Sequence, residues 1–240
     1  MRGRPYGFAV SDHCMACDWK EAGFFCDLPP AMLERFDVLA FTAAYPSGSV
    51  LFAEGEEARG VPLLCHGRAK LSMGASDGKT LILREAAAGE ILGLSAVMTD
   101  RQHDVTAETI EPSQVKFIRK EDFVQFVSHY PEVGARVALQ LANECLQSNE
   151  HVRALGLAHS AAEKLARLLL DWCSEKGVDT PNGIRVHILM THHDIAQMIG
   201  TSRETVTRLL GHFRDRGILE IHGASLIVHD RKALESLVMV

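Results

Sequence analysis

The chain has 240 residues, of which 47% are hydrophobic and 23% charged, and its formal net charge is −6. This length accommodates two modest domains, each with its own core, and the balance of apolar and charged residues is that of a globular protein. No apolar run approaches the about 20 residues that span a membrane, and no signal-peptide pattern opens the chain, so we expect a cytoplasmic protein with no membrane partner. The acidic balance argues against nonspecific, charge-driven binding of nucleic acid.

The first 30 residues form an irregular, cysteine-rich segment that ends at Leu28-Pro29-Pro30. Three of the six cysteines, Cys14, Cys17 and Cys26, lie in this segment. Structural disulfides are not expected in a cytoplasmic chain, so the clustering needs another explanation. From residue 31 to residue 44, apolar side chains recur at helical spacing and predict a short helix.

Residues 45–118 alternate short apolar segments with turn signals, which recur about every 8–12 residues. The strongest signal is Asp77-Gly78, which lies between two apolar segments and is typical of a tight β-hairpin. This region therefore predicts an all-β sandwich or barrel.

Helical patterns resume at about residue 120, and one long helix is predicted from Pro131 to about residue 158. A seam of side chains along it alternates steps of three and four residues, which is the spacing of a two-stranded coiled coil. Its members are Ala138, Leu141, Cys145, Ser148, Val152 and Leu155. Several of them are small, which favours a parallel homodimer over the alternative, a core helix of a single chain.

After a further helix over residues 161–175, two short amphipathic helices are predicted on either side of Gly200-Thr201-Ser202. Ser202 is placed to cap the second helix through its hydroxyl. Two strand-like segments, 218–221 and 225–229, follow. Two helices joined by a tight turn and followed by a β-ribbon predict a winged helix-turn-helix.

The first turns of the second helix carry polar side chains that suit the reading of DNA: Ser202, Arg203, Glu204, Thr207 and Arg208. A helix-turn-helix presents these turns to the major groove, where arginine donates two bonds to guanine and a carboxylate accepts from cytosine. His192, at the start of the first helix, is expected to contact phosphate. We therefore expect double-stranded DNA with palindromic half-sites as the partner of a homodimer. The alternative is an ordinary helical hairpin with a solvated charged face.

These elements predict an α+β chain in which an N-terminal β-sandwich or barrel is joined by a long dimerisation helix to a C-terminal winged helix-turn-helix. The β domain resembles cyclic-nucleotide-binding domains, and this resemblance implies a jelly-roll-like β-roll. The expected parts are the cysteine-rich extension (1–30), the β-roll sensor domain (31–119), helices that include the dimerisation helix (120–158) and the DNA-binding domain (159–240).

This order of parts resembles the CRP/FNR family of bacterial transcription regulators, and so does the segment Ser202-Arg-Glu-Thr-Val-Thr-Arg208. Weaker matches lie in the β-roll, at Gly67-Arg-Ala-Lys-Leu and Gly89-Glu-Ile-Leu-Gly-Leu-Ser. The resemblance implies that Arg203, Glu204 and Arg208 contact bases, and it adds RNA polymerase as an expected partner.

The resemblance also raises the alternative of a cyclic nucleotide bound in the β-roll. In members that bind cyclic AMP, a Gly-Glu pair takes the ribose and an arginine about ten residues later takes the phosphate. Here Leu94 follows Gly93, and Asp104 falls about where the arginine would lie, which is repulsive for a phosphate. A second register, Gly89-Glu90 with Arg101, leaves this alternative open.

The cysteine cluster points to a metal site or a thiol switch. Cys14 and Cys17 are spaced so that both sulfurs can meet one metal centre, Cys26 closes a loop around it, and Cys65 is the best-placed fourth ligand. FNR-type sensors hold a 4Fe–4S cluster with a similar N-terminal cluster and one distant cysteine. Here the spacing to the third cysteine is longer, and the distant cysteine would fall near Val115-Lys116-Phe117, where there is none. An iron–sulfur sensor of oxygen, nitric oxide or redox state, a zinc or thiol-based switch, and unligated cysteines are the three hypotheses.

A thiol- or metal-dependent enzyme is the alternative from another class. The sequence has no Gly-rich phosphate loop, no Gly-x-Ser-x-Gly and no His-Glu-x-x-His, so we expect no enzymatic activity. Cys145 and Cys173 are expected to act as small apolar residues.

Overall fold

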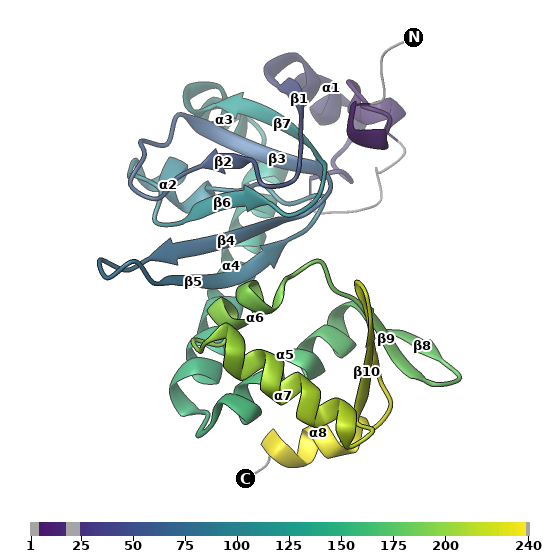
Figure 1. Ribbon diagram of the computed structural model, residues 1–240. Helices are drawn as coiled ribbons and strands as arrows, with labels where there is room; N and C mark the ends of the chain where they lie inside the picture. Colours follow the sequence, from purple (N-terminus) through teal and green to yellow (C-terminus); the bar gives the residue numbers. More distant parts are fainter. Residues whose placement is uncertain (1–4, 18–24, 239–240) are drawn as a thin grey trace. The chain divides into compact units, whose positions relative to one another are not determined.

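The computed structural model describes residues 5–17 and 25–238, and the chain divides into two compact units, residues 1–147 and 148–240 (Figure 1). The division falls inside helix α4 (Pro131–Leu157). Within the described ranges, no helix combines the length and the apolar character that crossing a bilayer requires.

The first unit contains two antiparallel sheets, with strand orders β1-β7-β3 and β2-β6-β4-β5. The strands are β1 (Phe41–Tyr45), β2 (Val50–Phe52), β3 (Gly60–His66), β4 (Ala69–Gly74), β5 (Thr80–Ala86), β6 (Thr106–Thr109) and β7 (Ser113–Arg119). The helices are α1 (Pro30–Leu39), α2 (Leu94–Thr99), α3 (Lys120–His129) and the first part of α4. The predicted series of short strands and turns is therefore confirmed except at residues 94–99, where helix α2 interrupts it, and the Asp77-Gly78 turn joins β4 to β5.

The helix predicted over residues 31–44 is wrong in its last part. Helix α1 ends at Leu39, and Phe41–Tyr45 form strand β1. Every residue of this strand pairs with β7, from Phe41 opposite Phe117 to Tyr45 opposite Ser113. Pairing with a distant strand thus overrides the local helical pattern, as strand propensity depends strongly on its neighbours.

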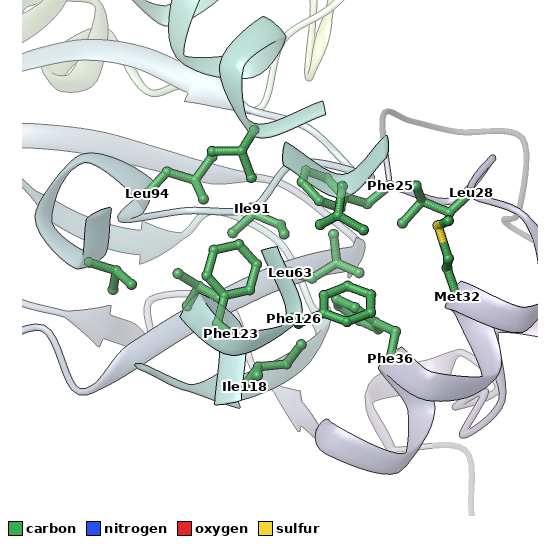
Figure 2. Close-up of a cluster of buried hydrophobic side chains, with 14 of the residues drawn as sticks. Phe25, Leu28, Met32, Phe36, Leu63, Ile91, Leu94, Ile118, Phe123 and Phe126 are labelled. Carbon is green, nitrogen blue, oxygen red and sulfur yellow. The ribbon is translucent and has the colours of Figure 1, made fainter. Parts of the chain in front are cut away.

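Strand β3 divides the first unit's core into two apolar clusters. Alternate side chains of a strand point to opposite faces. Val61, Leu63 and Cys65 accordingly belong to the cluster formed with the helices, whereas Leu64 belongs to the cluster that also takes residues from β2, β4, β5 and β6. Figure 2 shows the helical cluster, in which Phe25 and Leu28 of the N-terminal segment also take part.

The second unit combines a four-stranded sheet of order β10-β11-β9-β8 with helices α5–α8. Its elements are α5 (Ala161–Lys176), β8 (Val178–Thr180), β9 (Gly183–His187), α6 (His192–Met198), α7 (Arg203–Asp215), β10 (Leu219–His222), β11 (Ser225–Val228) and α8 (Arg231–Val238). The predicted helix-turn-helix and wing are confirmed as α6, α7 and the β10–β11 hairpin. Strand β8 and helices α2 and α8 were not predicted.

Candidate DNA-binding surface and cysteine cavity

Side chains cap the N-termini of both helices of the helix-turn-helix. At α6, Thr191 and Asp194 form a reciprocal capping box, in which the Thr191 oxygen accepts from the Asp194 N–H at 3.1 Å. At α7, the Ser202 oxygen accepts from the Thr205 N–H at 3.2 Å, as the sequence predicts. Gly200 between the helices has φ +62, which a side chain would strain, so the tight turn depends on glycine.

Helix α7 separates its buried and exposed residues cleanly. Val206, Leu209, Leu210 and Phe213 are buried, at 0%, 7%, 3% and 1% exposure. The predicted base readers Arg203, Glu204, Thr207 and Arg208 and the cap Ser202 are exposed. Hydrogen bonds from its own backbone N–H and from the Ser202 hydroxyl lower the pKa of Glu204, so this carboxylate is ionised and able to accept from a base.

His192 links the two helices. Its Nδ1 lies 2.9 Å from the hydroxyl of Thr207, so the first helix holds a side chain of the second. Thr207 is thereby oriented, while Arg203, Glu204 and Arg208 remain directed to solvent on the same polar face.

Helix α4 carries large apolar side chains that are exposed in the described part of the chain: Leu139, Leu146, Val152 and Leu157 are 48%, 61%, 66% and 71% exposed. Of the seam predicted from sequence, Ala138, Cys145, Ser148 and Val152 are exposed. Leu141 is half-buried and packs on the helical cluster of its own unit. Leu155 is also half-buried and lies close to Gly200: a Cβ atom built on this glycine would be 3.7 Å from the Leu155 side chain. Of the four exposed large apolar side chains, only Val152 therefore belongs to the predicted seam; Leu139, Leu146 and Leu157 lie outside it.

All four predicted metal-binding cysteines line one small cavity of about 20 Å³. Cys14, Cys17 and Cys26 come from the N-terminal segment and Cys65 from β3. The cavity also receives Lys116 and Gln114 of β7. Cys173, by contrast, is buried in α5 as expected. Cys145 was also expected in the core, but it is exposed on α4.

The pairing of β3 with β7 explains why these side chains meet. Leu63 lies opposite Lys116 and His66 opposite Gln114, with a register shift at Cys65. Leu63, Cys65, Gln114 and Lys116 consequently share the face of the sheet on which the N-terminal segment lies. Lys116 also lies in the stretch Val115-Lys116-Phe117, near which the resemblance to FNR-type sensors implies the distant cysteine.

Buried side chains of β7 hold the N-terminal segment through its backbone. Gln114, 1% exposed, accepts from the Ser11 N–H at 2.9 Å and donates to the Ser11 carbonyl at 2.6 Å. Lys116, 2% exposed, donates to the Asp12 carbonyl at 2.8 Å and is ion-paired with Asp37 of α1. The Asp37 carboxylate in turn accepts from the Cys14 N–H at 2.7 Å.

The thiols of Cys14, Cys26 and Cys65 are protonated at neutral pH in the absence of a metal. Burial, and then hydrogen bonding to Asp37, raise the pKa of Cys14 to about 12. Burial, and then the neighbouring Cys17, raise the pKa of Cys26 to about 11. Burial also raises the pKa of Cys65. A bound cation reverses this balance, because a metal ion deprotonates a coordinating thiol.

The four thiols are suitable metal ligands by their chemistry, but their arrangement in the structure is not that of a metal site. Four thiols around one cavity are the soft ligands that iron–sulfur clusters and zinc prefer. Within residues 5–17 and 25–238, however, no group of three or more His, Cys, Asp or Glu side chains is arranged to hold a metal ion. The chemistry of the residues fits a thiolate-bound metal, and binding one requires the sulfurs to move together.

Two of the residues compared with a cyclic-nucleotide site, Leu94 and Glu90, are engaged in other contacts. Leu94 is 1% exposed in the helical cluster, and Asp104 is exposed. Glu90 pairs with Arg84 at 2.6 Å and accepts from the Ala87 N–H at 2.7 Å. Arg101 is exposed and lines a surface hollow with residues 57–59, 117 and 119–121.

His103 fills the space beside Gly93. It is 4% exposed, and its ring stacks on Phe52 with 3.9 Å between centroids. A Cβ on Gly93 would lie 2.7 Å from the His103 ring.

Both units match known families. Residues 42–130 match the cyclic nucleotide-binding domain, and residues 163–237 match the Crp-like helix-turn-helix domain. The Global nitrogen regulator of Synechocystis is 27% identical over 228 residues, which cover 94% of this chain and 96% of that protein. The CRP-like cAMP-activated global transcriptional regulator of Mycobacterium tuberculosis is 24% identical over 213 residues, which cover 89% and 95%.

Solved structures agree with the fold. FixK2 from Bradyrhizobium japonicum superposes with a TM-score of 0.72 at 23% identity, covering 84% of this chain and 98% of that one. A β-sheet domain of the cyclic nucleotide-binding type, a long helix and a winged helix-turn-helix define a DNA-binding transcription regulator. The chain belongs to the CRP/FNR family of these regulators.

Three residues around the cysteine cavity, Asp37, Gln114 and Lys116, were not predicted from the sequence as part of the site. A signal was present, because a lysine inside the apolar strand Val115-Lys-Phe-Ile requires a buried partner. No local pattern identifies that partner as Asp37, which lies 79 residues away.

Proposed function

We propose that this regulator is a homodimer that senses redox state or a gas, oxygen or nitric oxide, through a thiolate-bound iron–sulfur cluster at Cys14, Cys17, Cys26 and Cys65. The observation that carries the proposal is the convergence of three N-terminal thiols and the thiol of Cys65, which is distant from them in sequence, on one cavity. A 4Fe–4S cluster is the group we favour, and zinc bound by the same thiols is the second candidate.

The protein's own residues would hold the thiols and bring the extension to the sheet. Lys116 supplies a positive charge beside Cys14, which offsets part of the negative charge of bound thiolates. Gln114 and Asp37 fix the backbone of Ser11 and Cys14. A bound cluster would supply the redox and gas chemistry. Its loss would release the N-terminal segment and shift the equilibrium between DNA-binding states by the difference in its affinity for them.

The exposed apolar face of α4 supports the homodimer. Leu139, Leu146 and Val152 are 48%, 61% and 66% exposed, and exposed large apolar side chains that gather on a surface mark interaction sites. A two-fold dimer through α4 would bury them and present two α7 helices to successive major grooves of a palindromic site. RNA polymerase is then the expected partner at the promoter.

A cyclic-nucleotide sensor is the weaker candidate for this chain. Several relatives are named as cAMP-activated regulators. Here, however, Glu90 is bound to Arg84, and Leu94 stands in the place of an acidic residue within the apolar core.

The test is anaerobic purification followed by an absorbance spectrum and analysis of iron, sulfide and zinc. We expect a coloured protein that contains iron and acid-labile sulfide and loses both in the Cys14→Ser, Cys17→Ser or Cys26→Ser variant. Cys65→Ser tests the fourth ligand, and Cys173→Ser is the matched control. A colourless protein without iron or zinc would contradict the proposal.

A further inference from the structure

Gln140, on α4, binds both backbone groups of one residue of the β-roll. The Ile91 N–H donates to its Oε1 at 3.1 Å, and its Nε2 donates to the Ile91 carbonyl at 2.6 Å. Gln140 is only 3% exposed, so both bonds are shielded from water. Since an unmade buried hydrogen bond costs the full desolvation of its groups, the two residues are expected to move together.

Ile91 is one contact away from the cysteine cavity. It forms an antiparallel bridge with Leu63, and Leu63 lines the cavity two residues before Cys65. Phe25 and Leu28, on either side of Cys26, belong to the same buried cluster as Leu63 and Ile91 (Figure 2). A change in the positions of Cys26 or Cys65 therefore acts on the packing around the residue that Gln140 holds.

The next turn of α4 is attached to the same loop. Gln140 Nε2 also lies 2.9 Å from Glu144 Oε1, and Glu144 pairs with Arg84 at 3.0 Å. Arg84 pairs in turn with Glu90, the residue before Ile91, at 2.6 Å. A partly buried polar network of this kind fixes one arrangement when all its members are bonded.

Two exposed apolar residues of α4, Leu139 and Ala142, lie beside Gln140 in the sequence but on the solvent side of the helix. Leu139 is 48% exposed and Ala142 is exposed, whereas Gln140 between them is buried. Because an α-helix moves as a rigid rod over so few residues, a shift of Gln140 displaces Leu139 and Ala142 with it.

We propose that Gln140 is a positioning residue that couples the state of the cysteine cavity to the dimer face of α4. This coupling rests on the proposed function, since it transmits the signal of the same cavity. In one state of the cavity, Gln140 holds α4 in the position that favours the dimer. When the state changes and Leu63 and Ile91 move, Gln140 moves α4 with them.

The test compares two dissociation constants in each protein, using a palindromic duplex selected from random sequence by the wild-type protein. One is measured on anaerobic, iron-reconstituted protein and the other after exposure to air. For the wild type we expect the ratio of the two to be at least about fivefold. Gln140→Met keeps the side-chain size but removes both bonds, and we expect its ratio to fall towards one while its iron content and spectrum match the wild type. Gln147→Met, an exposed position on the same helix, should keep the wild-type ratio.

Gln140→Glu provides a second variant in case Gln140→Met does not fold. It keeps the acceptor for the Ile91 N–H and loses the donor to the Ile91 carbonyl, so an intermediate ratio is expected. If Gln140→Met or Gln140→Glu folds and keeps the full wild-type ratio of dissociation constants, the coupling role of Gln140 is overturned, while the proposed function stands. A wild-type ratio of one with iron bound would overturn the proposed function as well, because there would be no response to transmit.

Discussion

The ammonium of Lys116 lies 3.4 Å from the sulfur of Cys14 and is also ion-paired with Asp37. A cation, a carboxylate and a thiol from three separate elements thus meet beneath the N-terminal segment. Burying a charge is costly unless it is paired, so each of these groups depends on the others.

Asp37→Asn is expected to lower the free energy of unfolding by more than a typical substitution on a short helix would. Without the carboxylate, the Lys116 ammonium is left 2% exposed with only neutral partners. Removing one member of a buried ion pair costs about 3–5 kcal/mol of unfolding free energy. Urea denaturation of the full chain measures the loss. The double variant Asp37→Asn/Lys116→Met should recover part of it, and strictly additive losses would show that the pair is not coupled.

Attachment of the N-terminal segment should weaken in acid. Burial raises the pKa of Asp37, but hydrogen bonds from Lys116 and Cys14 outweigh it and lower the pKa below its usual value. A group with a lowered pKa in the fold stabilises it above the pKa of the unfolded state, and this contribution is lost as the pH falls through the folded pKa. We expect hydrogen exchange at residues 11–17, corrected for its intrinsic pH dependence, to become faster below about pH 4. In Asp37→Asn this acid step should be absent, and its persistence there would assign the step to another group.

Two arginines of α7 should determine which DNA sequence is bound. Arg203→Ala and Arg208→Ala each remove a side chain able to donate twice to guanine, and each is expected to cost about 1–3 kcal/mol of discrimination against the wrong base. Fluorescence anisotropy with the selected duplex and with base-substituted versions measures this. Arg214→Ala, in the last turn of the same helix, is the matched control and should keep the discrimination. Equal losses on all sequences would instead indicate contacts to phosphate alone.

The dimer should depend on the exposed face of α4. Leu146→Lys places a charge at a position that is 61% exposed in the single chain, and we expect it to convert a dimer to a monomer in sedimentation experiments. Val38→Lys, on α1, changes a residue that is 74% exposed and serves as the control. A dimer that survives Leu146→Lys but not Val38→Lys would place the interface elsewhere.

The sequence predicts the DNA-binding unit well because its signals are local. Ser202, Gly200 and the apolar spacing of Val206, Leu209 and Phe213 act within a few residues, and all of them take the predicted roles. The wing follows from the same kind of short-range pattern. No residue in this region has to find a distant partner before the pattern can be interpreted.

The cysteine cavity could be predicted from the sequence only in part. Spacing along the chain indicates that Cys14, Cys17 and Cys26 can act together, and Cys65 joins them as predicted. The role of Lys116 depends on the register of β3 against β7, and that of Gln140 on how α4 lies on the β-roll. Both are set by long-range packing, which a single sequence does not encode in any short pattern.

The affinity of anaerobically purified protein for the selected palindromic duplex, measured before and after air exposure, tests the central claim most directly. We predict that the affinity changes at least about fivefold in the wild type and in Cys145→Ser, and that it does not change in Cys17→Ser. An equal change in Cys17→Ser, or no change in the iron-containing wild type, would contradict control of DNA binding by the cysteine cavity.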